Sequence, residues 1–142
     1  MPLREGPTAA PAEPAADAGG ATLLLAEDEP LVRQLMARTL RRQGYSVLLA
    51  SDGEEAVEIF AREGDRIALV VLDALMPRMG GAQAFARMSE LRPGLRALFV
   101  SGYAPDVGGL AELVAAGRVA MLSKPFLAAD LVTHIRVLLE RR

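Results

Sequence analysis

The sequence predicts an α/β fold in which a parallel five-stranded sheet lies between two layers of helices. Short apolar runs alternate with amphipathic stretches, and glycine or proline separates most of them. Such alternation is typical of parallel sheets with right-handed crossovers and helices on both faces. We expect strands at residues 22–26, 45–50, 67–72, 96–100 and 119–122. We expect helices at residues 30–43, 53–63, 81–91, 105–116 and 127–140.

Composition limits the classes of protein. The 142 residues are enough for one domain with a proper core. Although 51% of the residues are hydrophobic, no apolar run approaches the roughly 20 residues of a membrane helix. The absence of cysteine excludes disulfides and thiolate catalysis, and a net charge of -2 argues against nucleic-acid binding driven by bulk charge. We therefore expect a cytoplasmic protein without a membrane or nucleic-acid partner.

Residues 1–20 differ from the rest of the chain. They are rich in proline, alanine and glycine, lack apolar periodicity, and contain no apolar centre that would predict a signal peptide. We expect a flexible linker or tail there and one folded domain at residues 21–142. A tail of this kind is typical of a domain that comes from a larger protein.

The first two strands each lead into a helix with a clear start. The first apolar run ends in the acidic residues 27–29, and Pro30 suits the first turn of a helix, where its missing N–H costs nothing. Ser51 or Asp52 caps the second helix, which Gly64 ends. The first helix is expected to bury Val32, Leu35, Met36, Thr39 and Leu40.

The third strand ends in a carboxylate. Four apolar residues, Leu69–Leu72, suit a strand buried on both faces of a parallel sheet, and Asp73 follows them. Taken alone, Asp73 fits a turn cap, but α/β proteins also build their sites at this edge of the sheet. Pro77 and Gly81 then close a short loop before the third helix.

The last two strands place further polar groups at their ends. The fourth strand ends in Ser101, and the fifth leads into Lys124. Of sixteen basic residues fifteen are arginine, so Lys124 is the only lysine. Lysine is a compact charge on a flexible stem, and we therefore regard Lys124 as a candidate functional group. The last helix is expected to bury Leu127, Leu131, Ile135 and Leu138.

The strand order decides whether these polar groups meet. The pattern does not fix the order, but in the flavodoxin-like order 2-1-3-4-5 the first and third strands are neighbours. Glu27 and Asp28 would then lie beside Asp73, with Ser101 and Lys124 at the same edge. Three carboxylates repel one another, and a hard cation such as Mg²⁺ relieves the repulsion. With a hydroxyl and an ammonium nearby, the set suits phosphoryl transfer onto Asp73.

Residues 22–142 resemble the receiver domain of two-component response regulators. The matching segments are LLLAEDE, LVVLDALMPRMGG, FVSGYA and LSKPF, in the order and spacing of the family. The last two segments are similar to those of C-terminal receivers of hybrid sensor histidine kinases. The resemblance implies a signalling domain, not an enzyme. Its Asp73 would accept a phosphoryl group from the phosphohistidine of a sensor histidine kinase or a histidine phosphotransfer protein, and so switch protein–protein interactions.

The resemblance also implies a metal site. Asp28, Asp73 and the backbone carbonyl of Leu75 would ligate Mg²⁺, and Glu27 would act at the metal through water.

The remaining family roles fall on the ends of the last two strands. Ser101 would hydrogen-bond the phosphoryl group, and Lys124 would pair with it, after a cis bond to Pro125. One departure stands out: the family usually has an aromatic residue where this chain has Met121, which puts its usual switching route in doubt. Tyr103 is a candidate substitute.

Other interpretations stay open. The acidic residues 27–29 are also compatible with capping of the first helix, and Ser101 with a turn; His134 is expected at the surface. A pseudo-receiver would bind partners without phosphorylation. A phosphatase of the haloacid-dehalogenase type needs a second carboxylate where Leu75 stands, and no P-loop motif is present. We expect no DNA-binding output domain in this chain, and either a monomer or a weak dimer.

Overall fold

The computed structural model describes residues 20–102, 114 and 117–140. Five strands form one sheet in the order β2-β1-β3-β4-β5, and every neighbouring pair is parallel. The strands are β1 (Thr22–Ala26), β2 (Ser46–Ala50), β3 (Ile67–Asp73), β4 (Ala97–Ser101) and β5 (Val119–Ser123). The predicted fold class and strand order are confirmed. The order matters for function because it makes β1 and β4 the two neighbours of β3.

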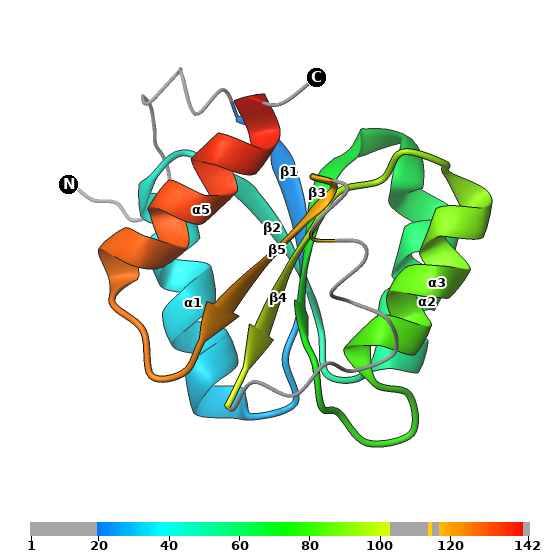
Figure 1. The fold of residues 1–142 in the computed structure, drawn as a ribbon, viewed down its shortest axis with the longest axis horizontal. Helices are drawn as coiled ribbons and strands as arrows, with labels where there is room; N and C mark the ends of the chain where they lie inside the picture. The colour runs from blue at the N-terminus through cyan, green and yellow to red at the C-terminus, as the bar shows by residue number, and fades with distance from the viewer. Residues whose placement is uncertain (1–19, 103–113, 115–116, 141–142) are drawn as a thin grey trace, which may run out of the picture.

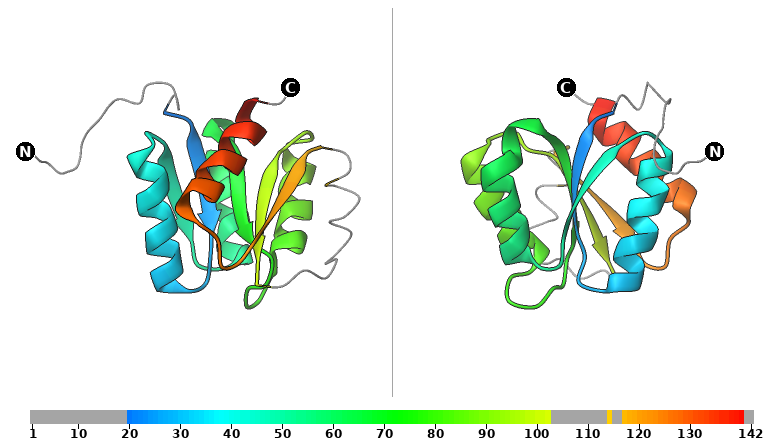
Figure 2. Two further views of the ribbon diagram at one scale, coloured as in Figure 1. Left: turned by 60° about the vertical axis from the view of Figure 1, so that its left-hand side comes forward. Right: turned by 180° about the vertical axis from the view of Figure 1, so that it is seen from behind.

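Helices cover both faces of the sheet, as predicted. Figure 1 shows α1 and α5 on one side of the strands and α2 and α3 on the other, and the views in Figure 2 agree. The helices are α1 (Pro30–Arg42), α2 (Gly53–Glu63), α3 (Gly81–Leu91) and α5 (Ala128–Glu140), and a 3₁₀ turn covers Gly64–Arg66. The helix expected at residues 105–116 lies outside the described residues, apart from Val114. No described helix is long and apolar enough to cross a membrane.

The apolar strands sort their side chains between two cores. Successive residues of a strand point to opposite faces. Thus Val70 and Leu72 of β3 pack on the side of α2 and α3, while Leu69 and Val71 pack on the side of α1 and α5. All four are fully buried, as the unbroken apolar run predicted. A strand held on both faces gives its last residue, Asp73, a fixed position.

Two leucines depart from the predicted burial. In α1, Met36 and Leu40 are buried as expected, but Leu35 is 62% exposed because the helix turns Ala37 toward the sheet instead. Leu127 is 70% exposed. Leu127 precedes α5, and its carbonyl accepts hydrogen bonds from the N–H groups of Asp130 and Leu131. Its side chain therefore lies outside the part of α5 that packs on the sheet.

Candidate functional site

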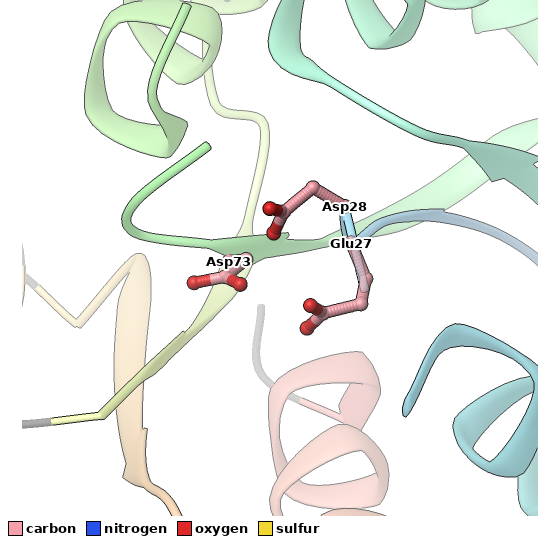
Figure 3. Close-up of side chains that lie close together, drawn as sticks. All are labelled: Glu27, Asp28 and Asp73. Carbon is pink, nitrogen blue, oxygen red and sulfur yellow. The ribbon is translucent and has the colours of Figure 1, made fainter. Parts of the chain in front are cut away.

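Three carboxylates meet where β1 and β3 end. Glu27 and Asp28 directly follow β1, and Asp73 is the last residue of β3. Because these strands are adjacent and in register, with Ala26 opposite Leu72, each of the three offers an oxygen within 4.8 Å of the others. Figure 3 shows the side chains gathering at this edge of the sheet. We call Glu27, Asp28 and Asp73 the acidic cluster.

Backbone groups hold two members of the acidic cluster. Glu27 is 1% exposed and Asp73 7%, whereas Asp28 faces solvent. The N–H of Glu29 donates to Glu27 Oε2 at 3.1 Å, and the N–H of Leu75 donates to Asp73 Oδ1 at 3.2 Å. Each buried carboxylate is therefore oriented by the chain that follows it.

Lys124 bridges the two buried carboxylates. Its Nζ lies 3.0 Å from Glu27 Oε1 and 3.2 Å from Asp73 Oδ2. The peptide bond from Lys124 to Pro125 is cis, as the resemblance implied. The N–H of Lys124 also donates to the carbonyl of Ser101 at 2.7 Å, which ties the end of β5 to the end of β4.

Burial and charge act against each other in this group. Burial is the largest influence on Glu27 and raises its pKa above the usual value, although the Glu29 N–H and Lys124 oppose the rise. Burial lowers the pKa of Lys124, but the hydrogen bond to Glu27 and the charge of Asp73 outweigh it and raise the pKa. Among the described residues, Lys124 pairs with two of the three carboxylates of the acidic cluster, so its single positive charge does not balance them.

The donor set fits a hard divalent cation. All three side chains of the acidic cluster offer carboxylate oxygens, without imidazole or thiolate. Oxygen-only sites with one or two carboxylates and room for water suit Mg²⁺. Asp28, whose exposed carboxylate lies on the solvent side, gives such a site an entrance. An open hollow adjoins it, lined by Asp28, the start of α3 and the loop before α3.

The other predicted residues lie at the same edge. Ser101 is 6% exposed at the end of β4, opposite Ser123 of β5 and next to Val100, which pairs with Asp73. Leu75 follows Asp73 by two residues and exposes 55% of its surface.

The structure also bears on the alternatives for single residues. Glu29 occupies the N-cap of α1 without a side-chain capping bond, so it does not cap that helix. His134 is only half-buried, and its Nδ1 lies 2.8 Å from the carbonyl of Asp130 one turn earlier, which fits the predicted surface position. Met121 is half-buried against the core on the side of α2 and α3. Tyr103 lies outside the described residues.

Two arginines near the site were not singled out from the sequence. Arg33 donates to the carbonyl of Glu27 at 2.7 Å, and Arg78 pairs with Asp52 across neighbouring loops. Their partners were predicted: Glu27 as a residue of the metal site, and Asp52 as one of two candidate caps, which does cap α2 through the N–H of Glu55. An arginine among fifteen carries no sequence signal of its own.

Comparison with known proteins gives a consistent picture. The family model described as "Response regulator receiver domain" matches residues 23–136. Sensor kinase CckA of Brucella abortus is 38% identical over 124 residues, 87% of this chain and 13% of that protein. Response regulator receiver protein CpdR of Brucella abortus is 33% identical over 117 residues, 82% of this chain and 95% of that protein. The chain spans about half of Response regulator MprA of Mycobacterium leprae, at 38% identity.

A solved structure agrees. The receiver domain from Hybrid Histidine Kinase CckA superposes with a TM-score of 0.71 at 32% identity, covering 84% of this chain and 99% of that one.

Proposed function

Because the chain belongs to the response regulator receiver domain family, we propose that Asp73 accepts a phosphoryl group. The donor would be the phosphohistidine of a sensor histidine kinase or of a histidine phosphotransfer protein. We assign this role to a domain at residues 21–142. The role is that of a signalling substrate and not of an enzyme that turns over a small molecule.

One observation carries the proposal: the carboxylate of Asp73 is buried beside two other carboxylates and within 3.2 Å of the only lysine. A carboxylate that merely ended a strand would not require this concentration of charge. Buried groups with opposed electrostatic influences are typical of reactive sites.

Four residues of this chain would take part in the phosphoryl transfer. An oxygen of Asp73 forms a bond to phosphorus while the bond from phosphorus to the imidazole nitrogen breaks, and that nitrogen keeps the electron pair. The ammonium of Lys124 moves its hydrogen bond from Asp73 Oδ2 to a phosphoryl oxygen. The hydroxyl of Ser101 donates to another. The N–H of Leu75 holds the remaining oxygen of Asp73 in place.

The acidic cluster would hold Mg²⁺. We assign Asp28, Asp73 and the backbone carbonyl of Leu75 as its ligands, with Glu27 acting through water. When bound, Mg²⁺ supplies positive charge to the phosphoryl oxygens as negative charge develops on them. The donor set supports the assignment because it is made of oxygen alone.

Phosphorylation would change which proteins the domain binds. Leu31 and Leu35 of α1, the helix that follows Glu27 and Asp28, expose large apolar side chains that suit a protein partner. Met121 stands where the family usually has an aromatic switch residue, so we expect the signal to spread without that ring.

A small-molecule phosphodonor tests the proposal. We expect acetyl phosphate with Mg²⁺ to add one phosphoryl group to the intact protein, seen by mass spectrometry, and EDTA to prevent it. Asp73→Asn should abolish the product, because the amide is no nucleophile, while circular dichroism stays unchanged. Equal labelling of Asp73→Asn would contradict the assigned acceptor.

Two other results would favour the alternatives. A folded protein that is never phosphorylated, yet retains a partner, would be a pseudo-receiver. Sustained hydrolysis of a small phosphate ester would indicate a phosphatase.

A further inference from the structure

The loop between β3 and α3, residues 74–80, is fastened at its base beside the acidic cluster. The N–H of Gly81 donates to the carbonyl of Ala74 at 3.0 Å, and the N–H of Leu75 donates to Asp73. The loop therefore carries both the amide that orients Asp73 and the carbonyl assigned to the cation. Anything that fixes the loop also fixes these two groups.

The far side of the loop is fastened by Arg78. Its guanidinium forms an ion pair with Asp52, the buried N-cap of α2, and its Nε lies 3.5 Å from Glu54. The Asp52 side chain is only 4% exposed and also accepts the N–H of Glu55 at 2.8 Å. That N–H, followed by Arg78, lowers the pKa of Asp52 despite burial, so this carboxylate stays charged and paired.

The backbones of the two loops touch at the next residue. A Cβ placed on Gly53 would lie 2.2 Å from the carbonyl oxygen of Met79, which leaves no room for any side chain. Met79 itself is buried in the core formed with α2 and α3. The start of α2 therefore serves as a rigid support for the loop.

The conformation of Arg78 is not explained by local preference. Its φ is 66°, and among the described residues it is the only one other than glycine with positive φ. Glycine adopts this conformation more readily. The guanidinium is also largely exposed, 65% for the side chain, so it does not fill the core. Unlike glycine, Arg78 has a guanidinium that pairs with Asp52.

We propose that the Arg78–Asp52 ion pair is a positioning device that holds the loop over the acidic cluster and thereby sets its affinity for a divalent cation. This inference rests on the proposed function. The ion pair touches neither cation nor phosphoryl group and acts only through the loop. Arg78 is thus a positioning residue and not a catalytic one.

In Arg78→Gly, the direction of the change in Mg²⁺ affinity distinguishes the proposed positioning role from a simple charge effect. The variant removes a positive charge near a cation site, so electrostatics alone would tighten binding. It also relieves the positive φ, which offsets part of the stability lost with the ion pair, so the melting temperature should change little. If the ion pair positions the loop, the Mg²⁺ dissociation constant, measured by calorimetry, should instead rise by about tenfold, as when the outer partners of metal ligands are removed.

Companion variants isolate the pair. Asp52→Asn keeps an N-cap acceptor for α2 but removes the ion pair. We expect it to weaken Mg²⁺ binding as well, and to add little in the Arg78→Gly background. Arg78→Lys should recover part of the affinity. Arg66→Ala, which removes a surface arginine paired with Glu63, is the matched control and should leave both the Mg²⁺ affinity and loop exchange unchanged.

Hydrogen exchange in EDTA makes the test independent of the metal. The amides of residues 74–80 should exchange faster in Arg78→Gly than in wild type, while amides in β3 keep their protection. Unchanged exchange and an unchanged or tighter Mg²⁺ dissociation constant would overturn the inference. Failure of the proposed function would look different: wild type would bind no Mg²⁺, whereas loop exchange would still respond to Arg78→Gly.

Discussion

Glu27 and Asp52 are both buried carboxylates that face a cation, yet their pKa values shift in opposite directions. At the edge of β1 and β3, Lys124 pairs with Glu27 and Asp73, yet the pKa of Glu27 is raised because burial outweighs its partners. At the start of α2, Arg78 pairs with Asp52, and the pKa of Asp52 is lowered because the Glu55 N–H and the guanidinium outweigh burial.

The difference lies in the balance of charge. Asp52 is one buried carboxylate with a backbone donor and a guanidinium, and it needs nothing further. Glu27 shares one ammonium with Asp73, and Asp28 lies beside them. Because the acidic cluster carries more negative charge than Lys124 balances, it can bind a cation. Lys124 can then pair with a phosphoryl group instead of with Asp73. Ion pairs alone thus do not mark a site; the uncompensated charge does.

The largest expected effect comes from removing one charge from the acidic cluster, compared with removing the same charge from the residue beside it. Asp28→Asn takes away an assigned ligand and a negative charge, so we expect the Mg²⁺ dissociation constant to rise by about 100-fold, roughly 2.7 kcal/mol. Calorimetry at fixed ionic strength measures it. Glu29→Gln removes the same charge from the neighbouring exposed residue and should change affinity by no more than about twofold. Similar losses in both variants would mean that general charge, not coordination, governs binding.

A smaller effect should come from the close contact that supports the balanced pair. In Gly53→Ala the new methyl group would overlap the Met79 carbonyl, so the two loops must separate. We expect a loss of about 1–3 kcal/mol of unfolding free energy, or roughly 3–6 °C in Tm per kcal/mol. Thermal denaturation measures it. Gly102→Ala is the control, since a Cβ there meets no atom of the described residues within 4 Å and the stability should be unchanged. Equal stability of the two variants would show that the loops are not held together.

The unbalanced region was largely predictable from the sequence, and the reason is topological. Buried strands are largely apolar, so polar residues at or just after their ends, such as Asp28, Asp73 and Ser101, stand out. Once the order 2-1-3-4-5 is assumed, those strand ends must share one edge. Lys124 stood out because no other lysine competes with it. The bounds of the described strands and helices agree with the sequence pattern to within about one residue, whereas the helix predicted at residues 105–116 is not tested.

Beyond the capping role of Asp52, the balanced region was not predictable, because the partners of Arg78 are set by packing. Nothing in the residue type of Arg78 announces a positive φ, which is far commoner in glycine or asparagine. Its pairing with Asp52 depends on how closely Gly53 and Met79 approach. The predicted burial of Leu35 was wrong for a related reason. The apolar residues of α1 form two overlapping stripes, and only contact with the sheet decides which stripe is buried.

The smallest expected effect concerns Glu27 and uses pH to separate the two regions. A carboxyl whose pKa is raised in the folded state favours folding when it is protonated. That contribution is complete below the ordinary pKa of about 4.5 and is lost as pH rises through the folded pKa. Glu27→Gln is uncharged at every pH, so in EDTA it should raise Tm by a few degrees at pH 7. The gain should shrink toward zero near pH 4.

Asp52→Asn should behave in the opposite way. The pKa of Asp52 is lowered, so its charged form stabilises the fold above its ordinary pKa and the benefit is lost as pH falls through the folded pKa. The variant should therefore melt lower than wild type at pH 7, with the deficit closing in acid. Melting curves of both variants between pH 4 and 7 compare the two regions directly. If Glu27→Gln melts lower than wild type at pH 7, Lys124 compensates Glu27 fully, and the charge excess must reside on Asp28 and Asp73 alone.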